Sequence, residues 1–140
     1  MDAQQIKAIA LEMGACELIH EADSIGSLVS LMVTPQGREF CKKHEFPCLE
    51  IFCQHKDELK AMNVFVDAGD ITIDDIDNVV VVGNTNALIR CKKTDKPYHA
   101  MVMHGAKAKV IAYGYSICHV VNIGGEVETH ASKNASIFLK

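Results

Sequence analysis

Five residues of the kinds that bind zinc lie close together in the N-terminal half: Cys41, His44, Cys48, Cys53 and His55. Zinc takes Cys sulfur and His nitrogen in a tetrahedral array, and the ligands usually come in closely spaced pairs. The step from Cys41 to His44 suits such a pair on one helical turn. The step from Cys48 to Cys53 does not, because it turns the two side chains of a predicted helix in different directions. Zinc binding is therefore one hypothesis for this group. The alternative is that Cys41 and Cys53 are core residues, His44 ends a helix and His55 is exposed.

A second pair, Cys16 and His20, stands four residues apart and could share one face of a helix. A Cys–His nucleophile needs a third group that orients the His, and a pocket for the substrate. No nearby residue marks either of them. We therefore predict no catalytic residue here.

The other histidines fall in the C-terminal half: His99, His104, His119 and His130. A row of His on one face of a sheet could bind metal or respond to pH near neutrality. The spacing of these four is irregular, and this favours solvated surface.

An acidic cluster follows residue 66: Asp67, Asp70, Asp74, Asp75 and Asp77. Carboxylates can hold calcium, but the Gly and Glu positions of an EF-hand loop are missing. The cluster is more typical of an acidic surface that discourages strand pairing. Phosphate-binding loops of the Walker and dinucleotide types are also absent, and we predict no cofactor.

The composition suits one domain of 140 residues, or two small parts with a shared core. Trp is absent and the net charge is −4, so the core must be built from small residues, and nucleic acid is an unexpected partner. The N-terminus lacks the pattern of a signal peptide, and no apolar run is long enough to span a membrane. The six Cys are then expected to be free thiols in the cytoplasm.

Residues 1–63 carry the signals of a helical unit. Asp2 can cap a first helix, and Asp23 or Ser24 a second. Thr34 followed by Pro35 predicts the start of a third, which should end near His44. We expect Phe46-Pro47 to open a fourth helix.

The run Leu31–Phe40 resembles a short stretch of winged-helix regulators, in which Thr-Pro-x-Gly precedes the last helix. This resemblance implies a DNA-binding regulator that would use the helix after Thr34. Any helix start uses the same residues, so a Thr-capped helix within the helical unit is the alternative.

Residues 64–140 repeat a small or apolar residue at short intervals. The reference positions are Ile71, Val79, Ala87, Ala100, Ala108, Ser116, Val127 and Ala135, with steps of 8, 8, 13, 8, 8, 11 and 8 residues. Between the corners, residues of two kinds alternate along the chain. Lys107, Lys109 and Ile111 should therefore face one side of a strand, and Ala108, Val110 and Ala112 the other. Asn, Asp and Gly stand where tight corners are needed.

Short strands at a fixed spacing predict a β-solenoid of about four coils, with two strands and sixteen residues in each coil. The two longer steps predict inserted loops, one at 92–97 and one at 122–125. An antiparallel β-sandwich or meander is the alternative. The predicted fold class is thus α+β: a helical cap at 1–63 and a solenoid-like stack at 64–140.

Runs such as Asn86-Ala87-Leu88-Ile89 and Asn134-Ala135-Ser136-Ile137 resemble the Asn-Ala-x-Val-x-Ala-type β-repeats of uncharacterised bacterial proteins. The resemblance covers about half of the chain. It implies the fold and a bacterial source, and no activity.

These observations predict a non-enzymatic structural or interaction protein. We expect the helical unit to cap the first coil of the solenoid. The last strand, 136–139, would then have an exposed edge that a second subunit could cover, so we expect a homo-oligomer.

Overall fold

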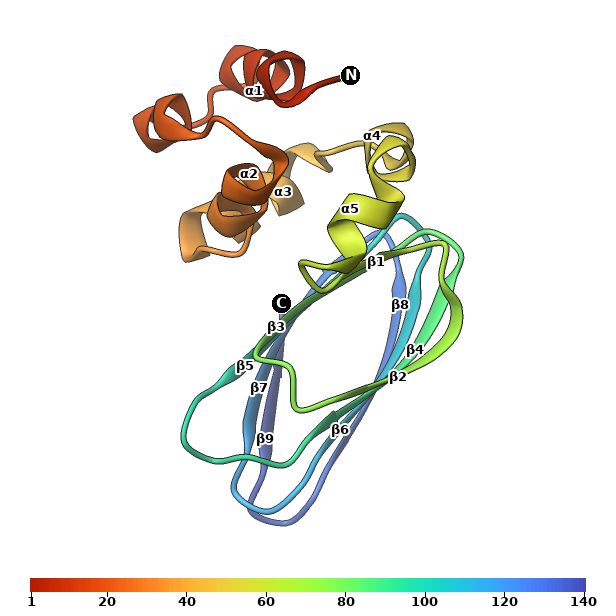
Figure 1. Ribbon diagram of the computed structural model, residues 1–140. Coiled ribbons are helices and arrows are strands. Elements are labelled where there is room, and N and C mark those ends of the chain that lie inside the picture. The colour runs from red at the N-terminus through yellow and green to blue at the C-terminus, as the bar shows by residue number, and fades with distance from the viewer.

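The computed structural model describes all residues, 1–140, and places the helices before the strands (Figure 1). The helices are α1 (Ala3–Glu12), the 3-10 helix η1 (Glu17–Glu21), α2 (Ile25–Met32), α3 (Pro35–His44), α4 (Leu49–Gln54) and α5 (Lys56–Lys60). The strands are β1 (Val64–Val66), β2 (Gly69–Asp74), β3 (Asn78–Val82), β4 (Thr85–Cys91), β5 (Tyr98–Met103), β6 (Lys107–Ala112), β7 (Ile117–Ile123), β8 (Glu126–Ala131) and β9 (Ser136–Leu139).

Three predicted helix starts are confirmed. Asp2 and Ser24 accept hydrogen bonds from Gln5 and Ser27 backbone nitrogens, and each forms a reciprocal capping box. The Thr34 hydroxyl accepts from the Gly37 N–H, with Pro35 at the first helical position.

The predicted start of the fourth helix at Phe46-Pro47 is wrong. Helix α4 begins at Leu49, after Cys48 in an extended conformation. The Pro47 carbonyl oxygen instead lies 2.6 Å from His104 Nε2, so a residue of the stack takes the oxygen that a longer helix would use.

The strands form a β-solenoid, as predicted. Sheet A has the strand order β1-β3-β5-β7-β9 and sheet B the order β2-β4-β6-β8. Every pairing in both sheets is parallel, which excludes the antiparallel alternative. In each coil the chain crosses sheet A, turns, and returns through sheet B (Figure 1).

The predicted repeat frame is correct in sheet B and slips in sheet A. Ile71, Ala87, Ala108 and Val127 pair in one column. In sheet A, Val79 and Ala100 continue to Val120 and Leu139. The predicted members Ser116 and Ala135 lie four residues before these positions.

The cause of the slip is a corner that the prediction put in the wrong place. Ser116 ends the corner between β6 and β7, where its buried hydroxyl donates to the Cys91 carbonyl oxygen. The predicted insertion at 122–125 is instead a two-residue corner, Gly124-Gly125, with Gly124 at φ 79°. The predicted loop at 92–97 is confirmed.

The interior of the solenoid is filled by small side chains that alternate with outward-facing ones. Ala108, Val110 and Ala112 are buried, whereas Lys107 and Lys109 are exposed, as predicted. Val110, Cys118 and Val120 have no exposed area. In parallel register each of them stacks on a similar residue of the next coil.

The helices do not cap the first coil, and that expectation is wrong. They pack along the outer face of sheet A, where one apolar cluster joins helical residues such as Phe52 to Val80, Met103 and Ile123 of three successive coils. The reason is that sheet A carries apolar side chains on its outer face from β1 to β7, and these need a cover. None of the helices has the length and apolar character needed to cross a membrane.

Candidate functional site

Strands β8 and β9 form an open edge of the solenoid. Strands β8 and β9 are the outermost strands of sheets B and A, and each pairs with a neighbour on one side only. Their inward residues Val127, Ile137 and Leu139 continue the columns of the interior. We call these two strands, with their inward residues, the last-coil edge.

Burial falls sharply at this edge. Val120 has no exposed area, whereas Leu139, the next residue in its column, is 55% exposed. Phe138 beside it is 49% exposed. Exposed apolar side chains on an edge strand are typical of a surface that another chain covers.

The first coil presents a different end. Its inward residues Phe65, Ile71 and Ile76 are half-buried, so this end is less exposed than Phe138 and Leu139 at the other end. The predicted acidic cluster surrounds this coil: Asp67, Asp70, Asp74, Asp75 and Asp77. Four of these aspartates bond to the residues of the next coil. Asp74 pairs with Arg90 and Asp70 accepts from the Asn86 side chain. Asp67 and Asp75 accept from the backbone N–H groups of residues 84 and 92.

A ladder of stacked rings leads along the outer face of sheet A to the last-coil edge. The rings of His99 and His119 are 5.1 Å apart between centroids and 14° from parallel. His119 stacks on Phe138 at the same distance, at 18°. The three residues occupy one register position of β5, β7 and β9, so Phe138 is the last rung.

The two histidines of the ladder are held in a poorly solvated, positive environment. Desolvation, followed by the charges of Arg38, His119 and Lys140, lowers the pKa of His99 to about 4. The pKa of His119 is lowered too, by desolvation and by Lys140 and Arg38. Their buried Nδ1 atoms have no hydrogen-bond partner. Both rings are therefore neutral at pH 7.

The predicted zinc residues are not brought together. No three Cys, His, Asp or Glu side chains form a group that could hold a metal ion. Cys41 is buried, and burial raises the pKa of its thiol to about 12. His44 lies against the Phe40 ring, and His55 Nε2 is 2.7 Å from the Met1 carbonyl oxygen.

The remaining two members of that group, Cys48 and Cys53, are exposed. The Cys53 thiol donates to Asp67 at 3.4 Å. Desolvation, followed by the hydrogen bond and the charge of Asp67, raises the pKa of this thiol. The alternative reading holds for Cys41 but not for Cys53, which is not a core residue.

The other sequence candidates also have plain surroundings. Cys16 and His20 are both exposed. The guanidinium of Arg38 donates to the Val33 carbonyl oxygen, and helix α3 packs against β7. The helix proposed for DNA binding thus lies partly against the stack.

Solvated surface is confirmed for only one of the four histidines of the C-terminal half. His130 is exposed, whereas His99, His104 and His119 are partly buried. Sequence reasoning missed the ladder because His99 and His119 are twenty residues apart, which exceeds the sixteen-residue coil. The signal was available only after counting the four residues 113–116 of the corner between β6 and β7.

Comparisons with models of protein families, with curated proteins and with solved structures gave no match. The resemblance to bacterial β-repeat proteins stays a prediction.

Proposed function

We propose that the protein is a non-enzymatic structural or interaction protein, and that two copies associate through their last-coil edges. The observation that carries the proposal is the half-exposed state of Leu139 and Phe138 on β9, an edge strand that pairs on one side only. A second copy would supply what the next coil supplies elsewhere: backbone partners and an apolar cover.

A symmetric contact between two last coils fits the charges better than a head-to-tail contact. The last coil carries two Glu and two Lys side chains and is balanced: Glu126, Glu128, Lys133 and Lys140. The first coil is strongly acidic, and its first strand in sheet A, β1, has three residues. An isologous contact closes after two copies, whereas a head-to-tail contact would extend into fibres.

The packed interior supports a structural role. The interior side chains between the two sheets are small and buried, and the coils are joined by continuous parallel ladders. This construction provides a stiff platform whose edge can be presented to a partner. The proposal includes a reducing, cytoplasmic setting, supported by six cysteines that are all free.

Native mass spectrometry of the reduced, untagged chain at micromolar concentration tests the proposal. We expect a dimer without bound metal. Leu139→Lys should shift the population to monomer, because the new charge would have to be buried at the contact.

Met13→Lys is the matched control. Met13 is a large apolar residue, 39% exposed, at the C-terminal end of helix α1 in the helical half. This variant should stay dimeric. A monomeric wild type, open-ended polymers, or equal effects of the two variants would each contradict the proposed contact.

A further inference from the structure

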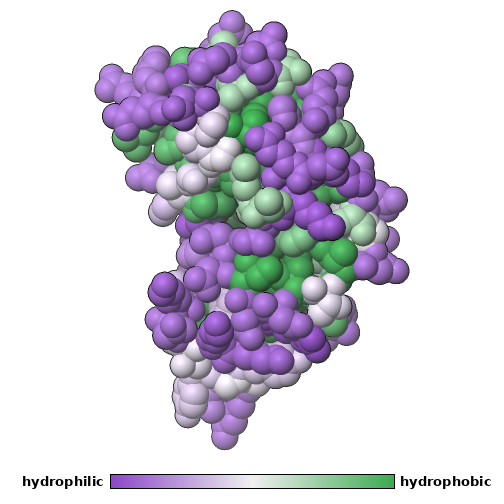
Figure 2. Space-filling model, viewed as in Figure 1, coloured by the Kyte–Doolittle hydropathy of each residue, from purple (hydrophilic) through white to green (hydrophobic).

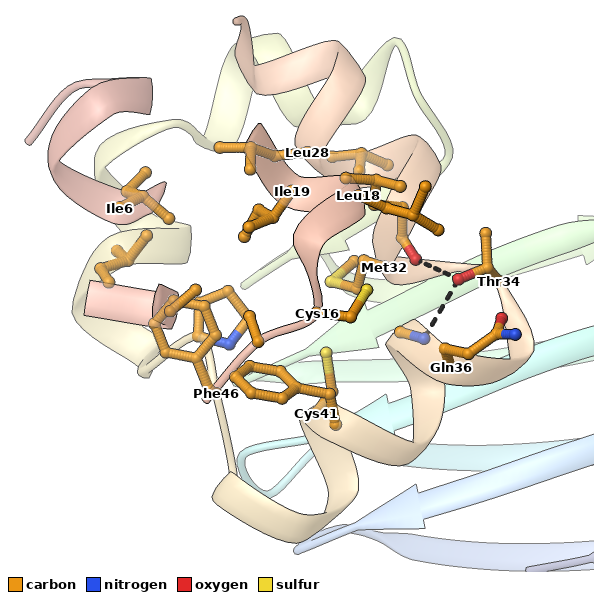
Figure 3. A pocket seen from close by; sticks show the side chains of 18 of the residues that line it. Ile6, Cys16, Leu18, Ile19, Leu28, Met32, Thr34, Gln36, Cys41 and Phe46 are labelled. Atoms are coloured by element: carbon orange, nitrogen blue, oxygen red, sulfur yellow. Dashed lines mark hydrogen bonds between the residues drawn. The ribbon is translucent and has the colours of Figure 1, made fainter. Parts of the chain in front are cut away.

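The helical half contains an apolar cavity of about 360 Å³. Residues of α1, η1, α2, α3, α4 and α5 line it, and 17 of its 25 lining residues are hydrophobic (Figure 3). Ile6 of α1, Leu28 of α2 and Phe46 of the loop between α3 and α4 line it. Figure 2 shows apolar surface between polar side chains over this part of the molecule.

Three polar side chains of the lining are already engaged or neutral. The Thr34 hydroxyl donates to the Leu31 carbonyl oxygen at 2.6 Å and accepts from Gly37 N–H (Figure 3). Burial keeps the Cys41 thiol protonated. His55 is turned to the Met1 carbonyl oxygen. No buried side-chain nitrogen or oxygen atom of the lining lacks a hydrogen-bond partner.

The charges at the cavity are balanced. Glu39 and Lys43 both line it, are exposed, and lie four residues apart on α3. This spacing places opposite charges next to each other on one helix face. An acidic or a basic head group would therefore meet one attractive and one repulsive charge.

We propose that this cavity is a binding site for a small, neutral, hydrocarbon-like molecule. Its volume is within the range of about 300–1,000 Å³ that is usual for small-molecule sites. Apolar cavities of about 150 Å³ already bind compounds such as benzene. The site lies in the helical half, so it is independent of the contact proposed at the last-coil edge.

Two cysteines of the unmodified chain provide the first test. Cys16 is exposed and lines the cavity, whereas Cys48 is exposed and does not. The neutral dye N-phenylnaphthylamine should slow alkylation of Cys16 by N-ethylmaleimide and leave that of Cys48 unchanged, as read by mass spectrometry. Equal rates at Cys16 with and without the dye would overturn the proposal.

A filled cavity provides the second test, and the absence of Trp from the chain makes it convenient. Leu28→Trp should weaken dye binding at least tenfold, because the indole would occupy the space. Ile111→Trp, on the outer face of sheet B, is the matched control and should bind as the wild type does. If both variants melt like the wild type and both bind the dye equally, the site is not this cavity.

The neutral character of the ligand is tested by competition. Decanol should displace the dye at a concentration at least tenfold lower than decanoate does. The opposite order would overturn the assignment of a neutral ligand, because it would show that Lys43 selects a carboxylate.

Discussion

The two halves of the molecule solve the packing of similar apolar residues in different ways. Inside the solenoid, Val110, Cys91 and Val120 have no exposed area and belong to one apolar cluster. In the helical half, Leu28 and Phe40 are half-buried and face a cavity of about 360 Å³. The residues are alike in hydrophobicity, so geometry makes the difference.

Parallel register is the physical cause of the contrast. Each inward side chain of the stack meets its counterpart one strand away, and Ala, Val and Cys fill a narrow, regular space. Short helices meet at varied angles and fit ridges into grooves imperfectly unless their side chains are matched in size. The stack is thus suited to stiffness, and the helical half to holding a ligand.

A charge placed in the stack should give the largest effect. Val110→Asp buries an unpaired carboxylate, and we expect it to lower the free energy of unfolding by more than about 4 kcal/mol. Lys109→Asp is the matched control on the outer face, where it stands opposite Glu128. Like charges across strands should cost less than about 1 kcal/mol. Equal melting temperatures of the two variants would refute the inward register.

Truncating one side chain in each half sharpens the comparison. Ile89→Ala creates a new void in the filled stack and should cost about 3 kcal/mol. Leu28→Ala enlarges a cavity that already exists, so its cost should be about 1 kcal/mol. Urea titrations of the two variants measure the difference, and equal losses would show that the two halves are packed alike.

Much of this contrast could be predicted from the sequence. The strand repeat, the inward column through Ala87 and Ala108, and the caps at Asp2, Ser24 and Thr34 depend on neighbours close along the chain. Such local signals are expressed directly in residue type and spacing. The predicted start of α4 is wrong because a distant residue, His104, hydrogen-bonds to the Pro47 carbonyl oxygen.

The sites were harder to predict than the fold. The histidine ladder depends on how many residues each corner inserts, and a slip of four residues conceals it. The cavity depends on how six helical segments meet, and the spacing of residues within one segment does not report this. The Cys and His residues from 41 to 55 were close along the chain, but successive turns of α3 and α4 point them to different surroundings.

Acidification should lower the stability of the protein through His99, which lies on the outer face of sheet A. The pKa of His99 is near 6.5 in the unfolded chain and about 4 in the folded protein. Between these pH values the unfolded state therefore binds more protons. Stability should therefore fall as pH is lowered through this window. His99→Phe keeps a ring in the ladder and removes the titration. Its melting temperature should fall less between pH 7 and pH 4 than that of the wild type, and parallel curves would contradict this account.

The smallest expected effect is at a helix cap, and it tests whether the helical half can loosen while the stack stays intact. Thr34→Ala removes the oxygen that accepts from Gly37 N–H and should cost about 1 kcal/mol. Thr34→Ser keeps that oxygen and should cost less. Hydrogen exchange should then quicken at the start of α3 and stay unchanged in β5 and β7, because the stack has its own interior core. Faster exchange in both regions would show that the two halves open as one cooperative unit, and the difference between them would then lie in packing alone.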